Sequence, residues 1–380
     1  MRLEKYLPLL LFTSIFILSS FLVHMQTISI ERYSSDTFPH IIFLYRLFYE
    51  PNYYISHPLW HLLTFSISKL FFISVESAAA ISSAFFVTLW TYLVHWLVKK
   101  NLPNYSTWQH TLITFSIITV GPLCLPWYSK IIFLGQGSPN IWHNVTLWTV
   151  KPFALLSVWY TLKGIETSKK TAYIFAFIIV VLSIFAKPSF IIMFLPTLAI
   201  FSLIKGSYKD LVFQRYFFLL SSISILILSY QYTHTFVEDR ASHIIIDVGG
   251  VWSLSSQNIG ISIFLGLAFP LLLTLFKTGL LNDNTILLSW IMTFIGIAYY
   301  AIFAETGRFY SHGNFGWSYM LAMSLLYLFS IIKFFQIFSS LLFWKRYSLL
   351  ILLIIQTSIG VEYLYKVLLG QNPLYISIYL

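Results

Sequence analysis

The first candidate for chemistry is the carboxylate of Asp36, which stands in a polar stretch behind an apolar N-terminal run. The stretch reads Glu31-Arg-Tyr-Ser-Ser-Asp36-Thr-Phe-Pro-His40 and is followed by Arg46, Glu50 and Tyr53-Tyr-Ile-Ser-His57-Pro-Leu-Trp60. A carboxylate held in a partly desolvated cleft can act as a general base toward an acceptor hydroxyl. An aspartate shortly before a proline is also typical of a helix cap, and the two roles can coexist.

Histidines in the same stretch raise the question of a metal ion. His57 and His61 are spaced i, i+4, so on a helix both imidazoles would lie on one face and could bind a metal. The residues between them are Pro-Leu-Trp, so the acidic residue of an H-E-x-x-H site is missing. Cys124 is the single cysteine, which excludes an internal disulfide and a cysteine metal site. We expect no metal ligands and no requirement for a divalent metal or another cofactor.

Two later polar segments also interrupt the apolar sequence. The segment 134–146, Leu-Gly-Gln-Gly-Ser-Pro-Asn-Ile-Trp-His-Asn-Val-Thr, is rich in small and amide side chains. It could hydrogen-bond a sugar or phosphate, or form a tight loop capped by Asn140 or Asn144. The segment 304–317 contains Glu305 and Arg308, and Arg308 could bind a phosphate bidentately or pair with Glu305.

Two lysines stand beside prolines at or within apolar runs, Lys151-Pro152 and Lys187-Pro188. A cation there is costly unless an anion, a water-filled cavity or the membrane interface receives its ammonium. For Lys187 a bound phosphate is the natural partner, and snorkelling to the interface is the alternative.

The elements that must position these residues are membrane helices. The chain is 58% hydrophobic and only 9% charged, and runs of about 20 apolar residues, each long enough to cross a bilayer, recur from Tyr6 onward. The net charge of +10 comes largely from Lys and Arg in short connections, which indicates membrane topology rather than nucleic-acid binding. The first run, 6–25, is long and lacks a small-x-small cleavage pattern, so we expect a retained helix with a cytosolic N-terminus.

The sequence therefore predicts an all-α, polytopic transmembrane helix bundle of about 11–12 helices, forming a single transmembrane domain over residues 1–380. The expected helices lie near 6–25, 57–75, 78–98, 109–127, 147–162, 171–186, 189–204, 216–234, 259–276, 285–304, 317–333 and 347–366.

The polar breaks between these helices fall into two kinds. Basic breaks (Lys99-Lys100, 163–170, 205–215, Lys277 and 333–346) alternate from the fourth helix onward with polar, aromatic or acidic ones. The positive-inside rule makes the basic face cytosolic and the other face external. This assignment of faces fails if 6–25, 57–75 and 78–98 all cross the membrane, because Lys99-Lys100 and every later basic break would then be external. We therefore expect a first external loop, 26–56, with an interfacial helix near 38–50, and an interfacial or re-entrant course for part of 38–75.

These features resemble the GT-C superfamily of membrane glycosyltransferases, which use polyprenyl-phosphate-linked sugars on the external side of the membrane. The resemblance lies in Asp36 after a first helix, the surface helix and segment 53–60, Gly135-Gln136 with Asn140, and Ala186-Lys187-Pro188 opening a helix. It covers about half of the chain. The paired acidic motif usual in that family is represented here by Asp36 alone.

The resemblance implies transfer of a sugar from a polyprenyl-phosphate donor to a glycan or lipid acceptor at the outer face of a bacterial plasma (inner) membrane, building a cell-surface glycan. It assigns Asp36 as catalytic base, and Lys187 and Arg308 as phosphate binders. The other residues expected to bind substrate are His40, Arg46, His57, Gln136, Asn140, His143, Lys151, Glu305 and His312.

Two other functions fit the same sequence pattern. An O-antigen or capsule polymerase is also polytopic with external arginines, but it joins glycan blocks. A transporter or flippase for a lipid-linked glycan would use the charged external residues as a vestibule, although polar residues crowded toward one face argue against a through-path.

Overall fold

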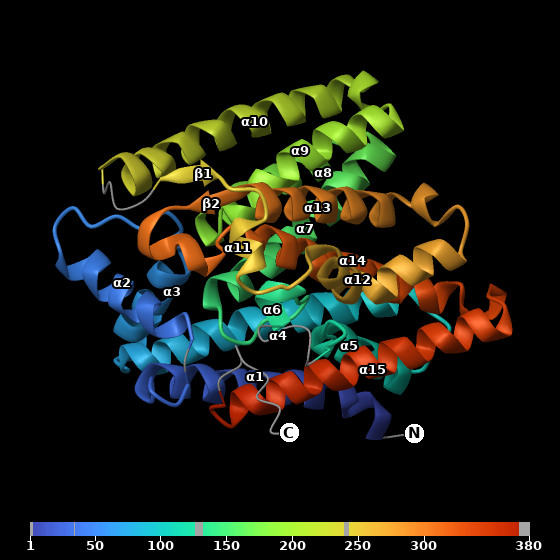
Figure 1. The fold of residues 1–380 in the computed structure, drawn as a ribbon, viewed down its shortest axis with the longest axis horizontal. Helices are drawn as coiled ribbons and strands as arrows, with labels where there is room; N and C mark the ends of the chain where they lie inside the picture. The colour runs from blue at the N-terminus through green and yellow to red at the C-terminus, as the bar shows by residue number, and fades with distance from the viewer. Residues whose placement is uncertain (1–2, 34, 126–131, 239–242, 372–380) are drawn as a thin grey trace.

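A computed structural model of the chain describes residues 3–33, 35–125, 132–238 and 243–371, and its fold is all-α, as predicted (Figure 1). Seven of the described helical segments are long and apolar enough to cross a membrane. They contain α1 (Leu7–Ile28), α4 (Val75–Asn101), α10 (Leu211–Tyr232), α12 (Ile259–Phe276), α13 (Asn284–Ile302), α14 (Gly316–Gln336) and α15 (Phe343–Leu368). The chain is therefore a multi-pass membrane protein.

The other described α-helices complete the bundle. They are α2 (Thr37–Tyr49), α3 (Leu59–Phe71), α5 (Thr107–Thr119), α6 (Ile132–Gly135), α7 (Val145–Thr167), α8 (Lys170–Ala186), α9 (Ser189–Lys205) and α11 (Gly250–Ser253). The break between α8 and α9 falls at Lys187-Pro188, as expected, because a proline disfavours the helical conformation of the residue before it. Lys187 is accordingly extended, with φ −167° and ψ 115°.

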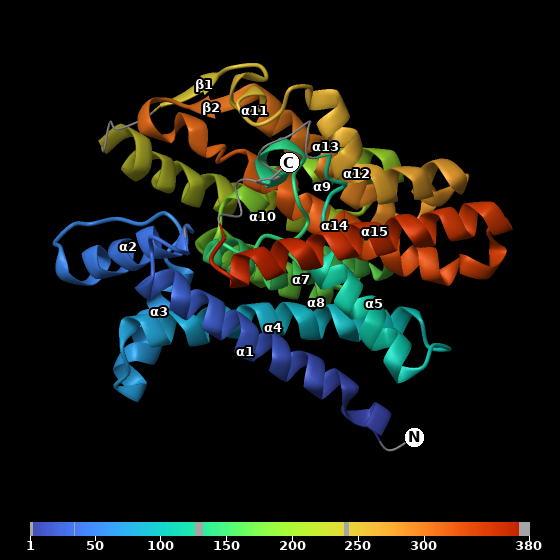
Figure 2. The ribbon, with the colours of Figure 1, turned by 60° about the horizontal axis from the view of Figure 1, so that its bottom comes forward.

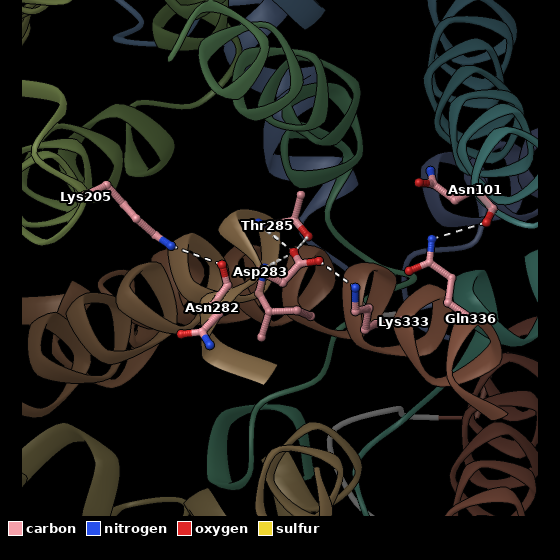
Figure 3. A network of polar contacts seen from close by, with 8 residues as sticks. Asn101, Lys205, Asn282, Asp283, Thr285, Lys333 and Gln336 are labelled. Carbon is pink, nitrogen blue, oxygen red and sulfur yellow. Dashed lines mark hydrogen bonds and ion pairs between the residues drawn. The ribbon is translucent and has the colours of Figure 1, made fainter. Parts of the chain in front are cut away.

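The connections that carry basic residues meet at one end of the bundle, called here the basic end and formed by residues 99–106, 168–169, 205–210, 277–283 and 333–346. Lys333 forms an ion pair of 2.8 Å with Asp283, which also caps α13 (Figure 3). Lys205 donates to the carbonyl of Asn282, and Gln336 donates to the carbonyl of Asn101 (Figure 3). These bonds tie together breaks that are far apart in the sequence.

At the opposite end lie α2, α3 and two short strands (Figure 1). Strand β1 (Ile244–Ile246) pairs antiparallel with β2 (Phe303–Glu305), with Ile244 opposite Glu305. The sequence did not suggest this ladder, because Phe303 and Ala304 were expected to end the helix 285–304. The ladder lies next to α13, which β2 directly follows.

The course of the first hundred residues explains how Lys99 and Lys100 can lie on the same face as the later basic breaks. Helix α2 confirms a helix near 38–50, and α3, at 13 residues or about 20 Å, is too short to cross a hydrocarbon core of about 30 Å. Figures 1 and 2 show α2 and α3 together at the end away from the N-terminus, with α4 running back along α1. Lys99 and Lys100 therefore return to the end of the bundle where the chain begins.

The predicted helix 109–127 is wrong from Val120 to Leu125, and its residues 126 and 127 lie outside the described residues. Helix α5 ends at Thr119, because Val120 leaves the helical region ahead of Gly121 and Pro122. From there to Asn144 the described backbone is largely non-helical, and residues 135–144 are buried throughout. The glycine Gly360 on α15 permits this course, since a Cβ there would lie 1.6 Å from the carbonyl oxygen of Thr119.

Cysteine labelling tests the course of α3. In a chain with Cys124 replaced by alanine, we introduce Glu50→Cys, Lys69→Cys or Lys209→Cys, all at exposed positions. Because α3 turns back without crossing, a membrane-impermeant maleimide should label positions 50 and 69 from one side and position 209 from the other. Labelling of position 69 from the same side as position 209 would contradict the fold.

Candidate functional site

The segment 134–142, which is non-helical after the end of α6 at Gly135, is the frame on which the candidate site is built. Buried main-chain carbonyls need hydrogen-bond partners, and here side chains from distant elements supply them. The carbonyls of Leu134, Gly135, Gln136, Pro139, Ile141 and Trp142 accept from Tyr300, Trp252, Tyr319, Lys151, Trp148 and Gln26, in that order. Gly266 on α12 lets the segment approach closely, since a Cβ there would lie 2.2 Å from the Gln136 carbonyl oxygen. The segment is thereby fixed in the protein interior.

Asp36 docks onto the end of this segment. Its main-chain N–H donates to the carbonyl of His143 at 3.1 Å, and its Oδ2 accepts from Asn144 Nδ2 at 2.7 Å. The following residue, Thr37, donates to Gln26 on α1, which in turn donates to the Trp142 carbonyl. Asp36 stands at the N-terminal boundary of α2, but its side chain makes no capping hydrogen bond. The carboxylate is therefore held by the 134–144 segment, and the cap expected as one alternative is not formed.

A chain of side-chain hydrogen bonds leads from Asp36 to a lysine. Asn144 Oδ1 accepts from Thr146 Oγ1 at 2.9 Å and caps α7 by accepting from the Leu147 N–H. Thr146 Oγ1 accepts in turn from Lys187 Nζ at 2.9 Å. Two prolines, Pro152 in α7 and Pro188 before α9, flank this region, and the break at Lys187 frees its ammonium to turn toward α7. The carboxylate of Asp36 and the ammonium of Lys187 are thus two side chains apart.

Aromatic and histidine side chains surround Lys187. Its ammonium lies 5.2 Å from the ring centroid of Trp317 at the start of α14. His143 packs edge-on to the same ring and forms a hydrogen bond of 2.9 Å through Nδ1 with Tyr363 Oη on α15. Burial lowers the pKa of His143, and the nearby Asp36 charge opposes this shift. We infer that this imidazole is neutral at pH 7.

Three histidines form a second cluster beside the lysine. His40 Nδ1 lies 3.1 Å from His61 Nε2, and the His57 ring centroid lies 5.8 Å from that of His40. Burial lowers the pKa of His40 and of His57 well below 6.5, and the positive charge of Lys187 adds to both shifts. Within the described residues, no group of three or more His, Cys, Asp or Glu side chains is arranged to hold a metal ion. The cluster offers neutral N–H groups next to a cation.

The structure thus brings together five of the predicted site residues: Asp36, His40, His57, His143 and Lys187. Burial differs among them. Lys187 and His40 are each 8% exposed, whereas Asp36 is half-buried. The carboxylate is therefore the more accessible of the two charged groups.

Other predicted residues lie in the supporting frame. Lys151 Nζ donates to the Pro139 carbonyl and to Asn140 Oδ1, while the Asn140 amide donates to the carbonyls of Ile117 and Val120. The side chain of Gln136 is fully buried, and in the part of the chain that the structure describes neither of its polar atoms has a hydrogen-bond partner. These contacts hold the segment 134–142 in place.

The remaining predicted residues lie elsewhere. Arg46 forms an exposed ion pair with Glu50. Glu305 accepts from Asn314, and burial raises its pKa, while His312 contacts Phe309 in the same connection. The side chain of Arg308 lies outside the described residues, so its predicted roles stay predictions.

Five residues of the site were not among the predicted site residues: Asn144, Thr146, Tyr363, Trp317 and His61, the last of which was considered only as one of a metal-binding pair. Asn144 was expected only as a possible helix cap, and it caps α7. The sequence Asn144-Val-Thr146 at the start of an expected helix could have indicated that both polar side chains belong to the site. Tyr363 lies between Glu362 and Lys366 near the end of an expected helix, and nothing in the sequence near it points to His143, 220 positions away.

The contact between Asn144 and Asp36 can be tested with Asn144→Asp, which keeps the helix cap but places two carboxylates within hydrogen-bonding distance. Because like charges raise the pKa of the pair above the unfolded value of about 4, the variant should lose about 1–3 kcal/mol of stability at pH 7 and recover it below about pH 4. Thermal unfolding in detergent at both pH values measures this. The matched control is Asn258→Asp at the N-cap of α12, which should lose none at pH 7. Equal behaviour of the two variants would contradict the assigned contact.

Comparison with known proteins finds no relative: no protein-family model, curated protein sequence or solved structure matches this chain. The geometry of its own residues is the basis for inferring its function.

Proposed function

We propose that the protein is a membrane glycosyltransferase that moves a sugar from a polyprenyl-phosphate donor to an acceptor hydroxyl. The observation that carries this proposal is the connection of Asp36 to Lys187 through Asn144 and Thr146. It sets a half-buried carboxylate and a buried ammonium in one site of a multi-pass membrane protein. Sugar transfer from a lipid phosphate needs a base for the acceptor and a cation for the departing phosphate.

In the proposed reaction Asp36 takes the proton of the acceptor hydroxyl as its oxygen bonds to the anomeric carbon. The bond between that carbon and the phosphate oxygen breaks, and its electron pair leaves with the phosphate. In the described part of the chain the contacts of the Asp36 carboxylate involve Oδ2, which leaves Oδ1 for the acceptor. The attack from the opposite side of the ring inverts the anomeric centre.

Lys187 supplies the positive charge for the phosphate. An ammonium has three N–H donors, and one of them is given to Thr146. Trp317 covers one side of the ammonium. The imidazoles of His40 and His57 lie close enough to the ammonium for its positive charge to lower their pKa. A phosphate at this position would neutralise a cation that the buried site otherwise holds at a cost.

The two ends of the bundle support an orientation for this reaction. The basic end carries the lysines and arginines of the short connections, as cytosolic loops do. Asp36 and Lys187 lie at the opposite end, which we place on the external side of a bacterial plasma membrane. A polyprenyl tail in the bilayer would then present its phosphate at that face, with a glycan or lipid acceptor reaching the site from outside.

Replacing Asp36 tests the base directly. Asp36→Asn keeps the shape of the side chain and an oxygen that can accept from the Asn144 amide, but it cannot take the proton of the acceptor hydroxyl. The glycosylated product should therefore fall by at least about 100-fold. Mass spectrometry of glycolipids from cells with the wild-type gene, the variant or no gene measures this. Glu50→Gln, an exposed carboxylate at the same end, is the matched control and should keep full product.

The same measurement separates the alternatives. One added sugar that depends on Asp36 supports the transferase, whereas a ladder of products indicates a polymerase. Full product in the Asp36→Asn variant at normal protein levels, or redistribution of a lipid-linked glycan without any new covalent product, would contradict the proposal.

The charge of Lys187 predicts a pH dependence. Burial lowers the pKa of this lysine to about 8, against the opposing pull of Asp36. If the ammonium binds phosphate, kcat/KM should fall about tenfold per pH unit above pH 8. The pKa of Lys187 in the folded protein lies below the unfolded value of about 10.5, so this group adds to the stability of the fold as the pH rises from about 8 to 10.5. Unfolding caused by its titration therefore cannot explain a fall in kcat/KM above pH 8.

The variant Lys187→Arg distinguishes this cause from others, because arginine stays charged to beyond pH 12. Its alkaline decline should disappear below about pH 10, even if its activity at pH 7 is lower, whereas Lys187→Gln should be inactive throughout. An unchanged decline above pH 8 in Lys187→Arg would refute the assignment.

A further inference from the structure

A second buried cation, Lys151 on α7, has surroundings that the proposed reaction does not use. Its side chain is 3% exposed, and its ammonium donates to the Pro139 carbonyl and to Asn140 Oδ1. Both acceptors are neutral, and among the described residues no carboxylate lies within ion-pair distance of this lysine. A buried cation without an anion is costly in a protein interior.

A cavity of about 20 Å³ lies against this lysine, between α4, α5, α7 and the segment 134–142. Its lining includes Lys151, Asn140 and the indoles of Trp90 and Trp142. A cavity of this size holds one water-sized species. It is therefore large enough for a single small ligand and too small for a sugar or a phosphate.

Some polar groups of the lining have hydrogen-bond partners and others do not. The indoles of Trp90 and Trp142 are each 4% exposed, and within the described structure neither indole N–H has a hydrogen-bond partner. The Asn140 amide is already engaged with the carbonyls of Ile117 and Val120. Groups that need a partner here are donors, because an indole nitrogen donates and cannot accept.

We propose that this cavity binds a small monovalent anion of the halide class, held by the Lys151 ammonium and the indole N–H groups of Trp90 and Trp142. Such an ion accepts from all three donors and neutralises the lysine. A water molecule would accept from two of them but would bring two hydrogens that need acceptors, and it would leave the charge uncompensated. The bound anion would also fix Pro139 and Trp142, and with them the neighbouring residues that hold Asp36.

Thermal unfolding of the full-length protein in detergent tests this site without any assay of activity. At matched ionic strength, potassium chloride should raise the Tm by about 2 °C over potassium gluconate, because a ligand that binds only the folded state stabilises it. Trp142→Phe and Trp90→Phe keep an aromatic ring but remove one donor each, so each should reduce the chloride-dependent shift by half or more. Trp96→Phe, a change outside the cavity, should keep the full shift.

Crystals soaked in bromide give the direct readout. An anomalous peak beside Lys151 Nζ that is lost in Lys151→Met, or in Trp142→Phe should the first variant fail to fold, supports the proposal. No peak together with equal Tm values in chloride and gluconate means an internal water only and overturns the proposal.

Discussion

Everything at the candidate site depends on one constraint: the backbone of residues 134–142, which is non-helical after Gly135, runs through the protein interior, where each carbonyl must find a donor. Helices satisfy this requirement internally, but this segment cannot. Tyr300, Trp252 and Tyr319 reach it from α13, α11 and α14, and Lys151 and Trp148 reach it from α7. The aromatic side chains of Tyr300, Trp252, Tyr319 and Trp148 thus donate to this one segment and also pack in the core.

Because the segment 134–142 is fixed, the residues that follow it can hold Asp36 in one position. The segment ends at His143 and Asn144, which together hold both the main chain and the carboxylate of Asp36. Asn144 also starts α7, so the N-terminus of that helix and the position of the Asp36 carboxylate are set by a single side chain. Lys187 completes the site because the break at Pro188 stops α8 at a position where the ammonium reaches Thr146.

Some residues of the candidate site could be picked out from the sequence, whereas most of the geometry of the site could not. Lys187 stands out because a charge is rare among apolar neighbours, and Asp36 because it is a carboxylate in the polar stretch behind the first apolar run. The break at Pro188 follows from local backbone sterics. The contact between Asp36 and Asn144 joins positions 108 residues apart, and no local pattern encodes it. The end of α5 at Thr119 was missed because the apolar run continues past it, and hydropathy does not distinguish a buried helix from a buried extended segment.

The most direct test of sugar transfer at this site is a measurement of product stoichiometry. Purified protein in lipid vesicles is supplied with a radiolabelled polyprenyl-phosphate sugar and an extract of membrane glycolipids as acceptors. The account predicts one molecule of free polyprenyl phosphate for each sugar that becomes bound to an acceptor, with inverted anomeric configuration. Movement of the intact donor between leaflets, without release of polyprenyl phosphate, would contradict it.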